Sequence, residues 1–185
     1  MDDSIASQYL DEARRQFHGY KRLGESAISQ LKDEELFFTL DPESNSVAIV
    51  IKHLAGNMRS RFMDFLTSDG EKPDRHRDQE FEMESRPTRD EVMKLWEKGW
   101  EYVFSALASL QPENVTHTVY IRGEAHTVLQ AINRQLAHYA LHIGQIVFLA
   151  KHLCSSEWNT LSIARGKSQD FQAVAEKYDR GIPRK

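Results

Sequence analysis

The stretch from Gly123 to Leu153 constrains the fold of this chain more than any other. Its apolar residues recur at alternating steps of three and four positions: Leu129, Ile132, Leu136, Tyr139, Ile143, Ile146, Ala150 and Leu153. This period is typical of an amphipathic helix that packs against other helices. The sequence therefore predicts one long helix from about Glu124 to Leu153.

Three earlier segments show the same helical period, over residues 4–32, from Val47 to about Gly70, and from Thr88 to the residues before Gln111. In the third segment Thr88 is followed three positions later by Glu91, the spacing of a capping box at a helix N-terminus. Four long helices with connections of mixed length predict an all-α protein, a four-helix bundle.

Two shorter features interrupt this helical pattern. Val115, His117, Val119 and Ile121 alternate with Thr116, Thr118 and Tyr120, which predicts a short β segment between the third and fourth helices. Its partner is not obvious, and the 71–84 segment is one candidate. Ser168 is expected to cap a short last helix that carries Phe171, Val174 and Tyr178. We expect the bundle domain to span residues 1–168 and a short helix and tail to span 169–185.

Composition limits the class of protein. A net charge of −4 over 185 residues gives no overall attraction to nucleic acid or to anionic membranes. The single cysteine, Cys154, excludes an internal disulfide framework and suits a reducing compartment. The acidic N-terminus resembles no signal peptide, and no apolar run reaches membrane-spanning length. We therefore expect a cytoplasmic protein with no nucleic-acid or membrane partner.

His138 and His142 are the first candidates for chemistry. They lie four positions apart, so on a helix they are separated by about 40° around the axis and about 6 Å along it. This spacing lets one helix offer two imidazoles to one metal ion, whereas the alternative is two histidines at the edge of a core. His53 lies beside the apolar positions of the second helix, as His138 and His142 do in the fourth, and is the candidate third ligand. Three histidines would leave a fourth position open, as in catalytic zinc sites.

Other chemistries find less support in the sequence. The segment from His138 to His142 lacks the glutamate that follows the first histidine in helix-borne zinc peptidases. There is no pair of Glu-x-x-His segments, which a di-iron carboxylate bundle would need, and no glycine-rich phosphate loop. Cys154 has no neighbour that marks it as a nucleophile.

Two paired segments resemble the DinB-like superfamily, also called YfiT-like. These are Ile51-Lys-His53-Leu54 and the late helix His138-Tyr-Ala-Leu-His142-Ile-Gly-Gln145. Residues 56–62, 69–73 and 158–168 are similar to one bacterial branch of that superfamily. One departure concerns Leu141, because many members carry a second, adjacent histidine there.

The resemblance implies a fold, a site and a reaction class. It implies a four-helix bundle that dimerises, with His53, His138 and His142 as the ligands of a divalent cation, zinc or nickel. It also implies either a metal-dependent hydrolase or a small-thiol-dependent transferase. The alternative is a non-enzymatic, stress-associated binding protein with the same helical bundle.

Further residues are expected around the site. Asn57 and Gln145 are the nearest candidates for polar contacts in the pocket. Because three histidines bring no negative charge, a bound divalent cation would favour an anionic ligand. We therefore expect the charged 71–84 loop and the 158–168 tail to border the pocket, with Arg77 and Arg165 among the residues that hold the rest of such an anion. Arg75 and Lys167 are further candidates. Broad apolar helix faces, including Trp96 and Trp100, lead us to expect a homodimer.

Overall fold

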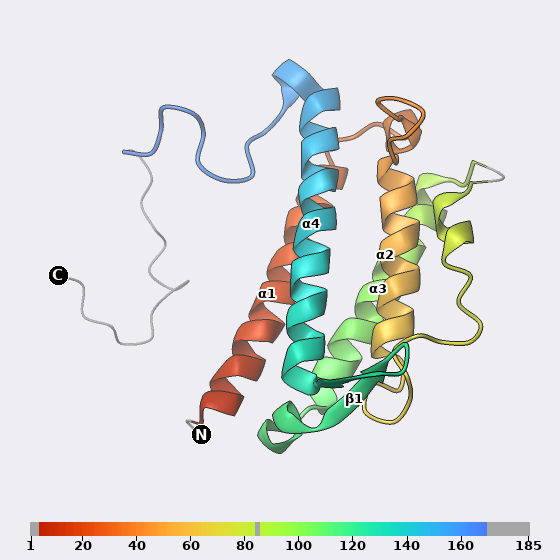
Figure 1. Cartoon of the computed structure of the whole chain (residues 1–185). Helices are drawn as coiled ribbons and strands as arrows, with labels where there is room; N and C mark the ends of the chain where they lie inside the picture. The colour runs from red at the N-terminus through yellow and green to blue at the C-terminus, as the bar shows by residue number, and fades with distance from the viewer. Residues whose placement is uncertain (1–3, 84–85, 170–185) are drawn as a thin grey trace.

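The computed structural model describes residues 4–83 and 86–169 (Figure 1). These residues form a bundle of four long helices: α1 (Ile5–Ile28), α2 (Val47–Phe62), α3 (Arg89–Ser109) and α4 (Val128–Cys154). The helix α2 packs mainly on α3, and α1 packs mainly on α4. The predicted all-α class is thus confirmed.

Side-chain caps explain where the long helices begin. Ser4, Ser46, Thr88 and Thr127 each accept a hydrogen bond from a backbone N–H in the first turn of the helix that follows. The capping box predicted for Thr88 and Glu91 is present. A hydroxyl at this position satisfies one of the backbone donors that a helix N-terminus leaves without a partner.

A two-stranded antiparallel hairpin precedes α4. The strand β1 (Thr118–Ile121) pairs with β2 (Glu124–Thr127), and Val119 lies opposite His126. The short β segment is therefore confirmed, but its partner is the stretch that we predicted as the first turn of the fourth helix. The turn residues Arg122 and Gly123 have φ values of 58° and 75°. Two successive positive φ angles are the backbone of a two-residue hairpin turn, which ends any helical path there.

The second helix is shorter than predicted. It ends at Phe62 rather than near Gly70, and the chain turns at Asp64, which has a positive φ of 51°. The segment then folds back on α2, because the Ser60 hydroxyl donates to the Gly70 carbonyl (2.8 Å) and accepts from the Lys72 N–H (3.1 Å). The first helix ends at Ile28 rather than at residue 32. The predicted last helix with Phe171, Val174 and Tyr178 lies outside the described residues.

Short 3-10 helices lie in the connections between these elements, at Glu34–Phe37, Asp78–Phe81, Pro112–Thr116 and Ser155–Glu157. The segment from Gly70 to Met83, which contains the second of them, runs along the outside of α2 (Figure 1). It is held there partly by Lys52, whose ammonium group donates to the carbonyls of Gln79 (2.6 Å) and Glu82 (2.7 Å). This loop therefore packs against the helix that carries His53.

The core contains an aromatic cluster to which every long helix contributes one ring. Phe17 of α1 contacts Phe62 of α2, Trp100 of α3 and Tyr139 of α4, with ring centroids 6.0, 6.4 and 5.7 Å away. Edge-to-face and tilted ring pairs of this kind add to the free energy of apolar burial. All four rings are buried, so the cluster fixes which face each helix turns inward.

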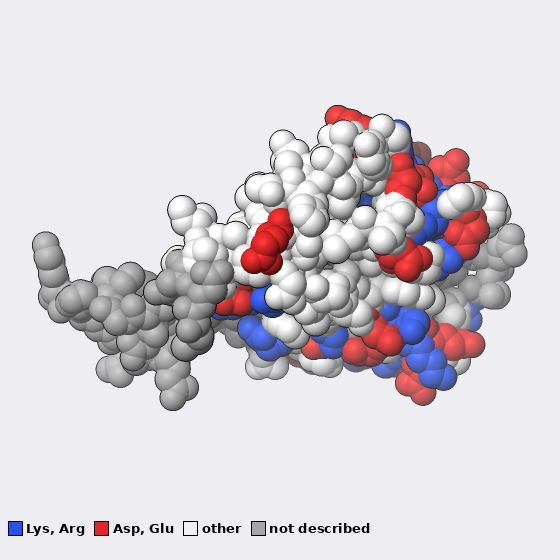
Figure 2. All heavy atoms as spheres, turned by 90° about the horizontal axis from the view of Figure 1, so that it is seen from below, with Lys and Arg blue, Asp and Glu red and all other residues white. Residues whose placement is uncertain are grey.

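Charged side chains cover the outside of the bundle unevenly. Seen from the hairpin end, acidic and basic residues are interleaved and gather towards the side on which Figure 1 places α2, α3 and the 70–83 loop (Figure 2). Among the residues that the structure describes, no helix combines the length and the apolar character needed to cross a membrane.

The contact between α2 and α3 yields a test of the packing. A Cβ atom at Gly99 would lie 2.9 Å from the Met58 sulfur and 3.0 Å from the Ala55 Cα. We expect Gly99→Ala to lower the free energy of unfolding by about 1–3 kcal/mol, since the core has no room for it. Gly19→Ala is the matched control, because nothing lies within 4 Å of a Cβ at that position of α1. It should raise stability by roughly 0.5–1 kcal/mol through helix propensity. Urea denaturation measures both, and equal effects would contradict the close approach.

Candidate metal centre

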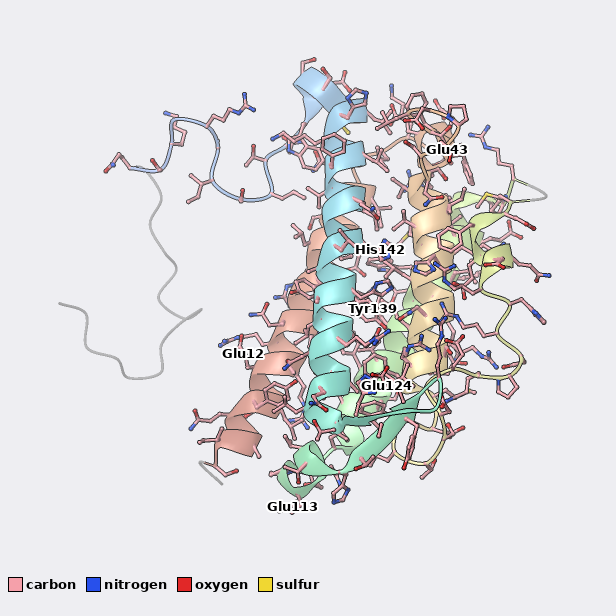
Figure 3. All side chains as sticks on the ribbon, viewed as in Figure 1. Glu12, Glu43, Glu113, Glu124, Tyr139 and His142 are labelled. Atoms are coloured by element: carbon pink, nitrogen blue, oxygen red, sulfur yellow. The ribbon has the colours of Figure 1, made fainter. Side chains whose placement is uncertain are left out.

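Three histidines from two helices converge between α2 and α4. The ring centroid of His53 lies 5.4 Å from that of His138 and 4.9 Å from that of His142, and the latter two are 4.5 Å apart. One ring nitrogen from each residue lies within 4.8 Å of the other two, which is close enough for the group to hold one metal ion. Figure 3 shows His142 projecting from α4 towards α2. The structure therefore brings together the three residues that the sequence singled out.

Hydrogen bonds determine which nitrogen each ring offers. The Nδ1 atom of His53 lies 2.8 Å from the Glu80 carboxylate, and Nδ1 of His142 lies 2.7 Å from Oε1 of Gln145. Both partners are acceptors, so each Nδ1 carries the proton and each Nε2 keeps its lone pair. The Nε2 atom of His138 is buried and has no hydrogen-bond partner among the described residues. Three imidazole nitrogens so close together are a donor set that could hold a metal ion.

The protonation state of the cluster also suits a cation. Burial lowers the pKa of His138 to about 3, with the charges of His142, His53, Arg61 and Arg75 as smaller causes. Burial likewise lowers the pKa of His142. Metal-binding imidazoles must be neutral, and these two are neutral at physiological pH without any cost of deprotonation.

Glu80 is a site residue that sequence reasoning missed. Its carboxylate accepts from His53 and also forms two hydrogen bonds with the Arg75 guanidinium, of 2.8 and 2.9 Å. Burial alone would raise the pKa of Glu80, but the hydrogen bonds from His53 and Arg75 hold it below its ordinary value. An ionised carboxylate on the far nitrogen of a metal-binding histidine is a common arrangement, which orients the ring and makes it more basic.

A glycine in α2 makes room for this carboxylate. A Cβ atom at Gly56 would lie 2.7 Å from the Cδ atom of Glu80, closer than real Cβ atoms approach other groups. Gly56 is three residues after His53, so the gap lies beside the histidine that Glu80 contacts. This glycine is the one signal in the sequence that could have indicated a close approach of the loop to α2 at this point.

Two polar residues named from the sequence lie at the site. Asn57 is buried in α2, one turn after His53, and its Oδ1 accepts a hydrogen bond of 3.1 Å from the Tyr139 hydroxyl. Gln145 accepts from His142 and lies on the exposed side of α4. Asn57 therefore connects the site to the aromatic cluster, whereas Gln145 orients one imidazole from outside.

A pocket of about 440 Å³ opens in front of the three histidines. Besides them it is lined by two amides, five arginines and one phenylalanine: Asn57, Gln135, Arg61, Arg75, Arg77, Arg122, Arg134 and Phe81. Arg77 thus lies where we expected it. Arg165 is absent from the lining and lies in the exposed segment after α4. That segment is attached beside the end of α1 instead, where Asn159 donates a hydrogen bond to Gln30.

Fold and site together define a helical-bundle protein with a three-histidine cluster that could hold a metal ion. The chain belongs to the family described as "Protein of unknown function (DUF1572)", whose model matches residues 4–167. No curated protein and no solved structure gives a significant match.

The contact between Glu80 and His53 generates a second prediction. Glu80→Gln keeps the size of the side chain but removes the charge that supports the imidazole. We expect it to weaken zinc binding by about 10–100-fold, the usual effect of losing a carboxylate partner of a ligand. Competition with a chromogenic chelator measures this affinity.

Glu71→Gln is the matched control. Glu71 forms ion pairs with Arg61, Arg75 and Arg122 but contacts none of the three histidines. It should leave the affinity for zinc unchanged even where it lowers stability. Equal loss of affinity in the two variants would show that the arginine network, and not the carboxylate on His53, is responsible.

Proposed function

We propose that this protein binds one divalent cation, zinc or nickel, through His53, His138 and His142, and presents it to a small molecule. The observation that carries the proposal is the convergence of three buried or half-buried imidazoles on a space that opens into a pocket. A structural metal site has four protein ligands, whereas a site with three leaves one position for a ligand from solution.

The reaction class follows from what lines the pocket. A divalent cation at this place would act as a Lewis acid that favours the deprotonated form of a water or a thiol. Among the described residues, the pocket lining contains no carboxylate, hydroxyl, thiol or lysine. Cys154 is remote, since its thiol lies against the Gln30 carbonyl beside the end of α1. The nucleophile must therefore come from solution, which supports a metal-dependent hydrolase or a small-thiol-dependent transferase.

The likeness to the DinB-like superfamily supports the same proposal. Its pattern is a histidine on the second helix with a His-x-x-x-His-x-Gly-Gln segment on a late helix, and here these residues form one cluster. The alternative function is that of a non-enzymatic, stress-associated binding protein. Turnover of a thiol acceptor or an ester by the metal-loaded protein favours the enzyme, and stoichiometric metal without turnover across such a panel favours the binding protein.

Metal content gives the most direct test. We expect protein purified without an affinity tag to contain close to one equivalent of zinc or nickel by elemental analysis. His53→Ala, His138→Ala and His142→Ala should each lose most of it, because each removes one of three ligands. His152→Ala is the control, since this exposed histidine lies on α4 outside the cluster. Wild-type protein that takes up no divalent metal, even after dialysis against zinc, would refute the proposal.

We further propose that the protein forms a homodimer through α4. The tryptophans that first suggested an interface are unsuitable, because Trp96 and Trp100 are buried in the core. The exposed face of α4 is the better candidate. Leu141 and Phe148 lie seven residues apart on it and are 61% and 63% exposed. The intervening Gly144 would let a second copy of the helix approach closely.

Light scattering coupled to gel filtration tests this interface. We expect wild-type protein to run as a dimer and the double variant Leu141→Lys, Phe148→Lys to run as a monomer, because four buried lysines would oppose each other across a two-fold axis. Ile5→Lys is the control, since it changes an apolar residue that is 87% exposed on α1. A wild-type monomer at high micromolar concentration would contradict the proposal.

A further inference from the structure

We infer that the end of the pocket distant from His53 is an anion-binding subsite, formed by Arg61, Arg122, Arg134 and Gln135. It would take the acidic group of a ligand whose other end lies at the three histidines. The ligand that reaches both ends rests on the proposed metal centre, whereas the anion subsite rests on its own residues.

The pocket is rich in positive charge. Five arginines line it, and the carboxylates that pair with them are those of Glu71, Asp78 and Glu80. Five guanidinium groups against three carboxylates leave an excess of two positive charges among the described residues at the pocket, in a protein whose net charge is −4. Such a local concentration in a partly desolvated pocket attracts an anion more strongly than scattered surface charges do.

Two of these arginines have guanidinium groups that are available to a ligand. Among the described residues Arg134 forms no ion pair, and the one ion pair of Arg122 is a contact of 2.9 Å between its Nε and Glu71. Arg122 is placed at the pocket by the hairpin turn, because Asp69 accepts from the backbone N–H groups of Arg122 (2.8 Å) and Gly123 (2.7 Å). Its side chain is 56% exposed, so its remaining N–H groups can reach a ligand.

Two buried polar atoms at this end of the pocket lack hydrogen-bond partners in the described structure. Gln135 is 3% exposed and lines the pocket, and its Oε1 has no hydrogen-bond partner in the described structure. The same is true of the Nε atom of Arg61, a residue that is 6% exposed. Buried polar atoms without partners are rare. The Gln135 oxygen is an acceptor, so its amide would contact an anion through the NH₂ donors after the side-chain amide is turned over, whereas the Arg61 Nε–H is a donor as it stands.

The subsite and the histidines lie at opposite ends of the pocket. On α2 His53, Asn57 and Arg61 follow one another at intervals of four residues, so His53 and Arg61 are separated by about 12 Å along the axis. On α4, which runs in the opposite direction (Figure 1), Gln135 precedes His142 by seven residues, or about 10 Å. The pocket therefore fits an elongated small molecule with two different ends.

This arrangement defines the class of ligand. One end carries a carboxylate or phosphate group, which guanidinium groups bind in bidentate geometry. The other end carries a group that a divalent cation accepts, such as a thiol or a carboxylate. Both ends are polar, and a short chain between them passes Asn57 and Phe81.

The experiment uses the full chain and a double variant, Arg122→Gln with Arg134→Gln. Both side chains are exposed enough to be replaced without loss of the fold, which circular dichroism checks. Arg61 is left intact because it also donates to the Gly70 carbonyl and so supports the loop. Arg165→Gln is the control, because Arg165 is an exposed arginine outside the pocket lining.

The first measurement is calorimetric titration of metal-free protein with inorganic phosphate. We expect the double variant to bind phosphate at least about tenfold more weakly than wild type, since it loses charge-assisted hydrogen bonds. Arg165→Gln should bind like wild type. Unchanged phosphate binding in the double variant overturns the subsite, and this holds whether or not the protein binds metal.

The second measurement compares malonate, adipate and suberate on zinc-loaded protein. The longer diacids should bind more tightly than malonate, because they can reach the cation and the arginines together. Their advantage should disappear both in the double variant and after removal of zinc. If the longer diacids still bind more tightly than malonate in the double variant, the proposal of a two-ended ligand is wrong. Failure of the protein to bind zinc would instead refute the proposed function and leave the phosphate result to decide the subsite.

Discussion

The burial of Tyr139 in the aromatic cluster is the constraint on which the arrangement of the site depends. Its ring packs against Phe17, Trp100 and Phe62, one from each of the other long helices. Once Tyr139 points inward, the rotation of α4 about its own axis is fixed. His138 and His142 precede the core-facing residues Tyr139 and Ile143, so both imidazoles lie beside the core and next to His53 of α2. The hydroxyl of Tyr139 then reaches Asn57, which ties this orientation to the helix that carries His53.

The loop from Gly70 to Met83 contributes residues to the site. It delivers Arg75 and Glu80 as a buried pair, and the Arg75 side chain is only 3% exposed. Burying two charges costs free energy unless both are well paired, and here Glu80 bonds to Arg75 and His53 while Arg75 also contacts Glu71. At the start of the loop, Asp69 bonds to the hairpin and Glu71 bonds to Arg61 of α2. These contacts attach the loop to the rest of the protein, and Glu80 packs against Gly56.

The helical periodicity of the apolar residues was the basis of most correct predictions from the sequence. The four helices and the three histidines were predictable because apolar spacing defines helix faces, and a ligand-type residue beside that spacing faces a neighbouring helix. The β2 strand was not, since the helical pattern of α4 extends back into it; the positive φ angles at Arg122 and Gly123 make the hairpin turn, and the cap at Thr127 sets the start of α4. Glu80 lies in a charged loop without any period, and its role comes from a tertiary contact. Trp96 and Trp100 are of a residue type that is common at protein interfaces, but here they are buried in the core.

Many members of the DinB-like superfamily carry a histidine where this chain has Leu141, and the orientation of α4 explains why this difference has little effect on the pocket. Leu141 is 61% exposed and does not line the pocket, so a histidine at that position would face outward from α4. The lining of the pocket therefore offers a ligand neutral imidazoles at one end and cationic and amide groups at the other, with no carboxylate among the described lining residues. On the proposed function, a site of this composition would orient an anionic molecule and an external nucleophile. Its selectivity then depends on the length and charge of the molecule that fits between the histidines and the arginines.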